Sequence, residues 1–308
     1  MAAITSALIK ELRERTQAGM SDCKGALVEA DGNIDAAVEI ILKKGIVKAA
    51  SRAGRVATEG EIRTFVTPDG ASAIIVEVNS QTDFVARGDE FKRFVSDVID
   101  VAKAAADGAD LDGLEYPGAA GKTVAVMRNE LIAKTGENTV LRRWARVVSS
   151  SENALVHAYV HPGSKLAVLI EASAPAGKKD APEFLKFIDE CSMQIAAMSP
   201  IVVNKNELSQ TDIDRQREIF AAQLKEEGKP EAAWPKIIEG KVAKWYTEVT
   251  LLGQDAVIEA GATIDKQRQL LGEKLGGEVI ILRFVRYSLG EGIEKKVEDL
   301  AAEVAKLM

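Results

Sequence analysis

Cysteine and histidine are scarce in this chain. Its 308 residues contain two cysteines, Cys23 and Cys191, and two histidines, His157 and His161. Two cysteines cannot form a disulfide framework, so we expect a fold held together by its cores in a reducing compartment. The spacing of the histidines suits a metal site on a helix, but residues 155–160 alternate as in a strand, where those positions lie roughly 13 Å apart. We therefore expect structural or surface histidines and no metal site.

Long apolar runs and an excess of basic charge are also missing. The chain has 40 basic and 47 acidic residues and a formal net charge of −7. Because no basic patch is segregated from the rest, this balance argues against direct binding to nucleic acid. No stretch reaches the ~18 apolar residues of a membrane span, and residues 1–6 lack the basic region that opens a signal peptide. We therefore expect a cytoplasmic protein without a membrane partner.

Motifs that perform catalysis or hold a cofactor are few. No GxGxxG occurs, and residues 118–123 imitate a phosphate loop without its GxxxxGK[ST] spacing or a preceding strand. The carboxylates lie on charged helix faces, and none is singled out as an acid–base pair. Cys23 stands beside Lys24 near a helix start, which could lower its pKa, but a packed thiol is the simpler interpretation. We expect no cofactor and no enzyme.

Residues 1–55 predict a three-helix N-terminal domain followed by a linker. The first helix has apolar residues at four-residue spacing; Ser21 is placed to cap the second helix and Asn33 to cap the third. Residues 43–45, two lysines and a glycine, should end the third helix, because cations and glycine favour helix C-termini. The basic residues 48–55 would then form a linker that is partly helical.

The central part of the chain predicts an α+β fold of two related halves, each an antiparallel sheet covered by helices. Subdomain N, residues 56–139, has two strands around the turn Pro68-Asp69-Gly70 and then a helix with an apolar face. Subdomain C comprises residues 140–206 and 248–287. For this second half we expect strands at 140–148, 155–160 and 166–172 and a helix at 184–198.

Residues 207–247 predict an antiparallel coiled-coil hairpin inserted into subdomain C. Its two charged helices are joined by Gly228-Lys229-Pro230, which combines a helix-ending glycine with a helix-opening proline. Gly240 in mid-helix costs about 1 kcal/mol relative to alanine, which close approach of the paired helix could offset. Residues 288–308 predict a C-terminal helical module with a terminal helix from Ile293. The expected apolar seam of the hairpin is Phe220, Leu224, Trp234, Ile238 and Trp245.

The stretch from Val78 to Ala86 is the most informative part of the sequence. An apolar, β-branched run predicts a buried strand that ends at Val78, and polar residues follow at once. Asp83 and Phe84 should therefore lie near the tip of a rigid element, where a side chain can be aimed at a partner. The chemistry of these residues also allows a simpler interpretation, in which Thr82 caps a short helix and Phe84 turns inward.

An ordered set of motifs now resembles one family along nearly the whole chain. The set closely resembles elongation factor Ts of the bacterial type, and it favours the outward orientation of Phe84. The motifs are Leu12-Arg13-Glu14-Arg15-Thr16, Ala18-Gly19-Met20, Asp22-Cys23-Lys24, Ala26-Leu27, Lys48-Ala49-Ala50, Ala53-Gly54-Arg55, Glu77-Val78-Asn79, Thr82-Asp83-Phe84-Val85-Ala86, Gly228-Lys229-Pro230, Glu239-Gly240-Lys241, Leu252-Gly253-Gln254 and Gly290-Glu291-Gly292-Ile293-Glu294.

The resemblance implies a guanine-nucleotide exchange factor that binds elongation factor Tu, both GDP-bound and nucleotide-free. It also implies a ubiquitin-associated-like first domain, a core of two α+β subdomains, a coiled-coil hairpin that could support self-association, and a C-terminal helix. Asp83 and Phe84 would press on the GTPase near switch II and disturb its Mg²⁺ and phosphate site. The partner-binding residues that the resemblance implies are Thr82, Asp83, Phe84, Val85, Met20, Lys24 and Arg52.

Three positions depart from the family pattern. Arg52 stands where lysine is frequent, so the charge survives but its geometry differs. Ser21 replaces an apolar residue, which puts a hydrophobic contact there in doubt. Gln194 replaces a histidine, at a position that belongs either to the core or to a contact surface.

Two other functions stay open at this point. Three-helix domains also occur in adaptors that bind nascent chains or ubiquitin without catalysis, and such an adaptor would leave GDP release unchanged. An enzyme with an unrecognised site would show a perturbed, buried carboxylate facing a pocket.

Overall fold

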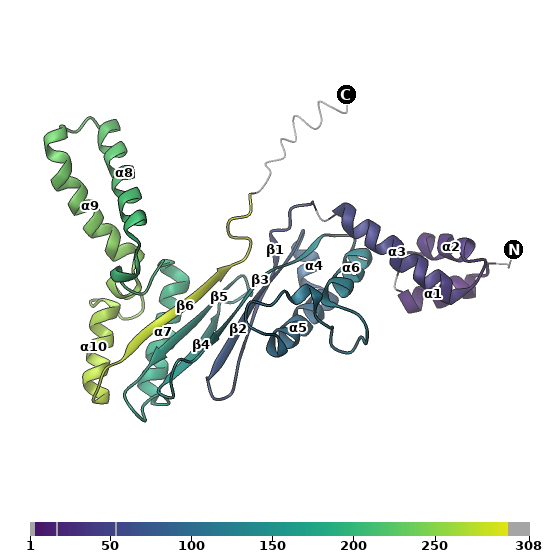
Figure 1. Cartoon of the computed structure of the whole chain (residues 1–308), viewed down its shortest axis with the longest axis horizontal. Helices are drawn as coiled ribbons and strands as arrows, with labels where there is room; N and C mark the ends of the chain where they lie inside the picture. The colour runs from purple at the N-terminus through teal and green to yellow at the C-terminus, as the bar shows by residue number, and fades with distance from the viewer. Residues whose placement is uncertain (1–3, 17, 53, 295–308) are drawn as a thin grey trace. The chain divides into compact units, whose positions relative to one another are not determined.

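The computed structural model describes residues 4–16, 18–52 and 54–294 of the chain (Figure 1). Contacts between Cα atoms divide the chain into two compact units. The first unit comprises Met1–Arg63, Val76–Trp144 and Ser288–Met308, and the second comprises Thr64–Ile75 and Ala145–Tyr287. The architecture is α+β, as the sequence predicts, with helices and two three-stranded sheets.

The chain begins with three helices, α1 (Ser6–Thr16), α2 (Met20–Glu29) and α3 (Ile34–Arg52). The side-chain oxygen of Asn33 accepts a hydrogen bond from the Ala36 N–H at 3.1 Å, so the predicted cap of α3 is confirmed. The helices enclose a small core in which the Cys23 side chain is fully buried, which confirms the packed thiol. The buried residues of this core are Leu12, Cys23, Ala26, Leu27 and Ala37.

Two local predictions for this domain are wrong. Ser21 does not cap α2, because Gly19 occupies that position and Ser21 lies inside the first turn. α3 does not end at Gly45 but continues to Arg52, so the linker, expected to be partly helical, is helical as far as Arg52. A glycine inside a helix costs only about 1 kcal/mol, which packing of α3 against α6 can offset.

The six strands found among the described residues form two sheets, and in each sheet the strands lie side by side in the order of the sequence. The first contains β1 (Glu59–Val66), β2 (Ser72–Ser80) and β3 (Thr139–Val148) in the order β1-β2-β3. The second contains β4 (Ala154–Val160), β5 (Leu166–Ser173) and β6 (Ile280–Ser288) in the order β4-β5-β6, and β4 pairs antiparallel with β5. The turn before β2 needs a glycine, because Gly70 has φ = +67°.

The duplication is present, but its sequence register differs from the one expected. The strand at 140–148, which we placed in the second half, is β3, the third strand of the first sheet. Each half therefore contains two strands, a long helix, a short 3₁₀ turn, another helix and a third strand; the first half adds one short helix after its second strand, and the second half contains the helical hairpin. The helical elements are α4 (Asp83–Arg87), α5 (Asp89–Ala104), η1 (Leu111–Gly113) and α6 (Val124–Thr135), then α7 (Pro182–Met198), η4 (Leu251–Gly253) and α10 (Ile264–Leu275).

The second helices of the two halves share their end signals. Thr123 caps α6 and Thr263 caps α10 by accepting a hydrogen bond from the backbone N–H three residues later. Each helix ends at a glycine in the left-handed conformation, Gly136 (φ = +81°) or Gly276 (φ = +80°). Such a glycine satisfies the last helical carbonyls and turns the chain into the following strand.

The helices with the clearest apolar faces were predicted correctly and pack in the core. α5 buries its expected face in the first unit, and α7 buries its face in the second. Burial of each large apolar side chain contributes about 1.5–3 kcal/mol. The expected residues found buried are Phe91, Phe94, Val95, Val98, Ile99, Ala102, Phe184, Phe187, Ile188, Cys191 and Ile195.

The predicted helical hairpin is present in the second unit. Its helices α8 (Gln210–Glu226) and α9 (Trp234–Val249) pack against each other, with the 3₁₀ turns η2 (Lys205–Glu207) before α8 and η3 (Glu231–Ala233) before α9 (Figure 1). Leu224 and Val242 are buried in the seam. No atom approaches within 4 Å of a Cβ built at Gly240, so the expected close approach of the paired helix there is wrong.

The end of the chain is only partly described. Ile293 and Glu294 follow β6 without helical structure, and the rest of the predicted C-terminal helix lies outside the described residues. Among the residues with described structure, no helix is both long enough and apolar enough to cross a lipid bilayer.

Candidate partner-binding site

The end of β2 presents Phe84 to solvent. Thr82 caps the short helix α4, and its Oγ1 accepts a hydrogen bond from the Val85 N–H at 3.4 Å. Ala86 is buried, whereas Phe84 is 85% exposed, so α4 rests on Ala86 and turns the aromatic ring outward. The predicted cap is confirmed, and so is the outward orientation that the resemblance favours. A large aromatic side chain left in water is a candidate anchor for a partner.

Asp83 stands beside Phe84 at the first position of α4. Its carboxylate pairs with Arg87 one turn later at 2.9 Å, and both side chains are in contact with water. A surface pair of this kind contributes little to stability, so the Asp83 carboxylate can leave Arg87 and contact a binding partner at little cost in free energy. Val85 is half-buried, between the exposed Phe84 and the buried Ala86. The site thus combines an acid and an aromatic on one short helical turn.

A turn that sequence reasoning missed holds the residues before Phe84. The Glu137 carboxylate accepts hydrogen bonds from the Thr82 N–H at 3.0 Å and from the Thr82 hydroxyl at 2.8 Å. The neighbouring Asn138 N–H donates to the Gln81 side chain at 2.8 Å. The available signal was a glycine followed by two polar residues directly before a strand, but it did not identify their partners.

Sequence reasoning also missed a buried glutamate on β2, the strand that precedes α4. Glu77 is fully buried in β2 and accepts hydrogen bonds from Arg142 at 2.8 Å, Arg143 at 2.6 Å and the Gly290 N–H at 2.8 Å. Burial alone would raise the pKa of Glu77, but the Gly290 N–H and the two guanidinium groups together hold it below its ordinary value. Since Arg143 also donates to the Ser288 carbonyl, this cluster holds the end of β6 and Gly290 against β2 and β3 within the first unit.

The remaining predicted site residues lie on the N-terminal helices. Met20 is 54% exposed at the start of α2, and Lys24 is exposed one turn later. Arg52, at the end of α3, is half-buried and donates to the Ile132 carbonyl at 3.3 Å. The structure therefore gives Arg52 an intramolecular partner in the last turn of α6, close in sequence to Glu137.

The comparisons with known proteins agree along the chain. The family model described as Elongation factor TS matches residues 81–291. A protein named Elongation factor Ts from Trichlorobacter lovleyi is 40% identical over 306 residues, 98% of each chain, and one from Nitratiruptor sp. is 43% identical over 314 residues, 99% of each chain. A third, from Clostridium perfringens, is 40% identical over 304 residues and 99% of each chain. The chain belongs to the elongation factor Ts family.

The elongation factor Ts match takes in most of the candidate site. Its first residue is Gln81, and it covers Thr82 to Val85, Glu137, and the chain after β6 as far as Glu291. The N-terminal helices with Met20 and Lys24 precede the family model but fall within the near full-length matches to relatives. Family membership gives the chain a role as a translation elongation factor.

The structure decides the alternative left open at Gln194. Gln194 is buried in α7, where its amide donates to Gln254 Oε1 at 3.0 Å and to the Asp255 carbonyl at 3.1 Å. Its own oxygen accepts from the Val257 N–H at 2.9 Å. Gln194 therefore belongs to the core and holds the loop after η4. Ser21, the other neutral departure, is exposed on α2.

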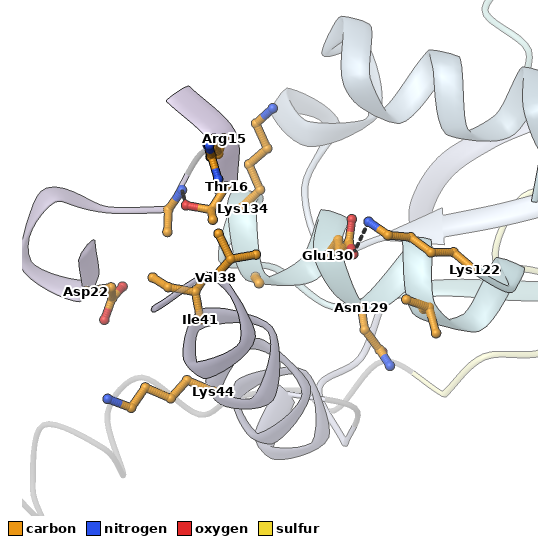
Figure 2. A pocket seen from close by; sticks show the side chains of 13 residues that line it. Arg15, Thr16, Asp22, Val38, Ile41, Lys44, Lys122, Asn129, Glu130 and Lys134 are labelled. Atoms are coloured by element: carbon orange, nitrogen blue, oxygen red, sulfur yellow. Dashed lines mark hydrogen bonds and ion pairs between the residues drawn. The ribbon is translucent and has the colours of Figure 1, made fainter. Parts of the chain in front are cut away.

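A cavity of about 350 Å³ lies where α1, α3 and α6 meet (Figure 2). Its wall includes apolar side chains, such as Val38 and Ile41, and four cations at the margin. Each of these cations is paired with a carboxylate, so the cavity does not present a free cation to an anionic ligand. The pairs are Arg15 with Asp35, Lys44 with Glu29, Lys122 with Glu130 and Lys134 with Glu90.

The histidines lie on β4 and just after it, as predicted. His157 Nε2 is 3.0 Å from the Asp189 carboxylate, and His161 Nδ1 is 2.8 Å from the Tyr159 hydroxyl. Within the described ranges, no three histidine, cysteine, aspartate or glutamate side chains gather as they would around a metal ion.

Proposed function

We propose that this chain is a guanine-nucleotide exchange factor that binds elongation factor Tu and promotes GDP release during translation elongation. The single observation that carries the proposal is the position of Phe84, which is 85% exposed on a short helix held at the end of a buried strand. A monomeric protein gains nothing from such a ring in water, whereas an interface gains a desolvated aromatic anchor. Membership of the elongation factor Ts family supports elongation factor Tu as the partner.

In this mechanism Asp83 and Phe84 press on the GTPase near switch II and disturb its Mg²⁺ and phosphate site, with Thr82 and Val85 in the same contact. The exchange factor and GDP then weaken each other's binding by the same factor, so a ternary complex forms and sheds its nucleotide. The chain binds both the GDP-bound and the nucleotide-free GTPase. It forms and breaks no covalent bond, so it is not an enzyme in the chemical sense.

Other surfaces of the chain support docking. Met20 and Lys24 on α2 would meet the nucleotide-binding domain of the GTPase, and Arg52 would do so with a guanidinium that already holds the Ile132 carbonyl. The α8–α9 hairpin would strengthen the complex or allow self-association. An N-terminal three-helix domain at residues 1–55, a core of two subdomains, a hairpin at 207–247 and a C-terminal module at 288–308 belong to the same proposal, as does a cytoplasmic location. The subdomain boundary expected at residue 140 is not kept, because residues 139–148 form β3 of the first sheet.

Release of fluorescent GDP from elongation factor Tu tests the proposal. The release rate is measured by stopped flow as the concentration of this chain is raised, with excess unlabelled GDP present. We expect the rate to increase with concentration and to saturate as the ternary complex fills. Binding without any change in the release rate would identify an adaptor and refute the exchange function.

A further inference from the structure

Glu137 lies at the junction between α6 and β3. Gly136 ends α6 in the left-handed conformation, with φ = +81°, and turns the chain so that Glu137 leaves the helix axis. Its side chain is half-buried and points to residue 82, which is 55 positions earlier in the sequence. α6 and the last part of β2, from Val76 onward, belong to the first unit, so this contact joins two secondary-structure elements of that unit.

The Glu137 carboxylate engages both donors of Thr82. The Thr82 N–H donates to Oε2 at 3.0 Å, and the hydroxyl lies 2.8 Å from Oε1 and 3.0 Å from Oε2. With its hydrogen directed to Glu137, the hydroxyl oxygen keeps its lone pairs for the Val85 N–H. The carboxylate therefore fixes the rotamer of the residue that caps α4, and the cap sets the direction in which the helix starts.

Asn138 adds a second attachment one residue further on. Its N–H donates to the Gln81 side-chain oxygen at 2.8 Å, and its amide nitrogen donates to the Arg55 carbonyl at 2.8 Å. Asn138 is buried, so these bonds are shielded from competition with water. Residues 81 and 82 are thus both held by the turn that follows α6.

α4 depends on such external supports. It has only five residues, and a helix of that length is unstable by itself in water. Phe84 contributes little packing because its ring is exposed, and the Asp83–Arg87 pair is a weak surface pair. Ala86 and the attachments at Gln81 and Thr82 therefore provide most of the support for the turn. A partner that needs the Phe84 ring in one orientation gains affinity when that orientation already exists before binding.

We propose that Glu137 is a positioning residue for nucleotide exchange, which acts through Thr82 to orient Asp83 and Phe84. This proposal rests on the exchange function proposed above. Glu137 presents no group of its own to the GTPase; its carboxylate keeps the cap of α4 in place while the complex forms and GDP leaves. Removing it frees the cap and allows α4 to fray, so the orientation of Phe84 is lost in part of the molecules.

The test compares Glu137→Ala and Glu137→Gln in the full chain, with Asp112→Ala as the matched control. Asp112, in η1, accepts hydrogen bonds from Arg128 of α6 through both carboxylate oxygens, at 2.8 and 2.6 Å, and thus also ties α6 to an earlier part of the chain, but at a distance from the α4 cap. We expect Glu137→Ala to lower kcat/KM for GDP release about tenfold, the scale of one hydrogen bond to a charged group. Glutamine retains an acceptor and should recover part of the loss, while Asp112→Ala should match the wild type.

A second background separates positioning from direct contact. If Glu137 acts only through the orientation of residues 83 and 84, Glu137→Ala should have little further effect in a chain that already carries Phe84→Ala. A full tenfold loss in that background would overturn the proposal, because the carboxylate would then act on the GTPase independently of the ring. Equal exchange rates for wild type and Glu137→Ala would overturn it as well.

Hydrogen exchange of the Val85 amide provides a readout that does not depend on activity. Glu137→Ala should speed deuterium uptake at Val85 while leaving uptake in α5 and β2 as in the wild type. If the wild-type chain fails to accelerate GDP release, the proposed function is refuted. The support of the α4 cap by Glu137 is then judged from hydrogen exchange alone: it is refuted as well if Glu137→Ala takes up deuterium at Val85 at the wild-type rate. If the wild type accelerates GDP release but Glu137→Ala and Glu137→Gln both take up deuterium at Val85 at the wild-type rate, the positioning role is refuted and the exchange function stands.

Discussion

Replacing Phe84 with alanine separates partner binding from folding more sharply than any other single change. The ring is 85% exposed and α4 is helical, so its removal takes away little buried area and introduces a better helix former. We expect the free energy of unfolding to stay within about 0.5 kcal/mol of the wild type. Thermal or urea unfolding measures this part of the prediction.

The effect on exchange should be much larger. A phenylalanine side chain buries on the order of 200 Å² when fully enclosed, and most of that area is still available in the free chain. At about 25 cal/mol per Å², full burial in an interface contributes at most about 4 kcal/mol, of which alanine retains part through its Cβ. We therefore expect a loss of about 2–3 kcal/mol, or about 30- to 150-fold in kcat/KM for GDP release.

Two control variants define the outcomes. Leu270→Ala removes another exposed apolar side chain, on α10, and should change neither stability nor exchange by much. Phe91→Ala removes a buried ring of α5 and should cost about 3–5 kcal/mol of stability. If Phe84→Ala behaves like Phe91→Ala, with stability and exchange falling together, the reasoning from exposure is refuted. Unchanged exchange in a folded Phe84→Ala chain would refute the anchor.

Three further predictions concern stability and the hairpin. Glu77→Gln should lower the free energy of unfolding by roughly 3 kcal/mol at pH 7, because two guanidinium groups lose their carboxylate. The difference from wild type, measured by denaturant unfolding, should shrink below about pH 4, because the stability that comes with the lowered pKa of Glu77 is lost when the carboxylate is protonated. Gly240→Ala should raise the free energy of unfolding by about 0.5–1 kcal/mol, whereas Gly272→Ala should lower it, because its Cβ would meet a backbone carbonyl oxygen at 2.7 Å. Denaturant unfolding that shows both variants stabilised, or both destabilised, would contradict this. Replacing residues 210–247 by a short glycine bridge should leave a folded chain, because hydrogen bonds between residues 201–203 and 249–252 close the base of the hairpin. This deletion should form a weaker complex but still accelerate GDP release at saturating concentration; complete loss of exchange in a folded deletion would refute that division of labour.

The best sequence predictions came from elements whose local pattern agrees with their burial. The β-branched run of β2 and the cap at Thr82 indicated both the strand and the turn that follows it. α5 and α7 were predicted because their apolar residues lie on one face. In each case a single segment contains the whole signal, so no knowledge of distant partners is needed.

α6 and α10 were missed because their signals are weaker or easily confused. The apolar residues of α6 are spread around the helix, and only Val124, Leu131 and Ile132 are buried. Thr123, which caps α6, was considered only as part of a failed phosphate loop. Because α6 was not predicted, nothing in the prediction connected β3 to the first half, and β3 was assigned to the second half of the duplication.

The contacts of Glu77 and Glu137 depend on partners far away in the sequence. Glu77 meets residues 65, 66 and 213 positions away, and Glu137 meets Thr82 across 55 positions. A charge inside an apolar strand does indicate a buried ion pair, so Glu77 could have been noticed. Its partners could not, because many arginines in the chain offer the same chemistry.

Turnover of elongation factor Tu by a small amount of this chain tests the exchange function most directly. The GTPase is loaded with labelled GDP, excess unlabelled nucleotide is added, and the chain is supplied at about a tenth of the GTPase concentration. Because an exchange factor leaves its partner once nucleotide rebinds, we predict that the whole pool of labelled GDP is released at an accelerated rate. Release limited to the fraction of GTPase bound by the chain, or no acceleration, would contradict the account.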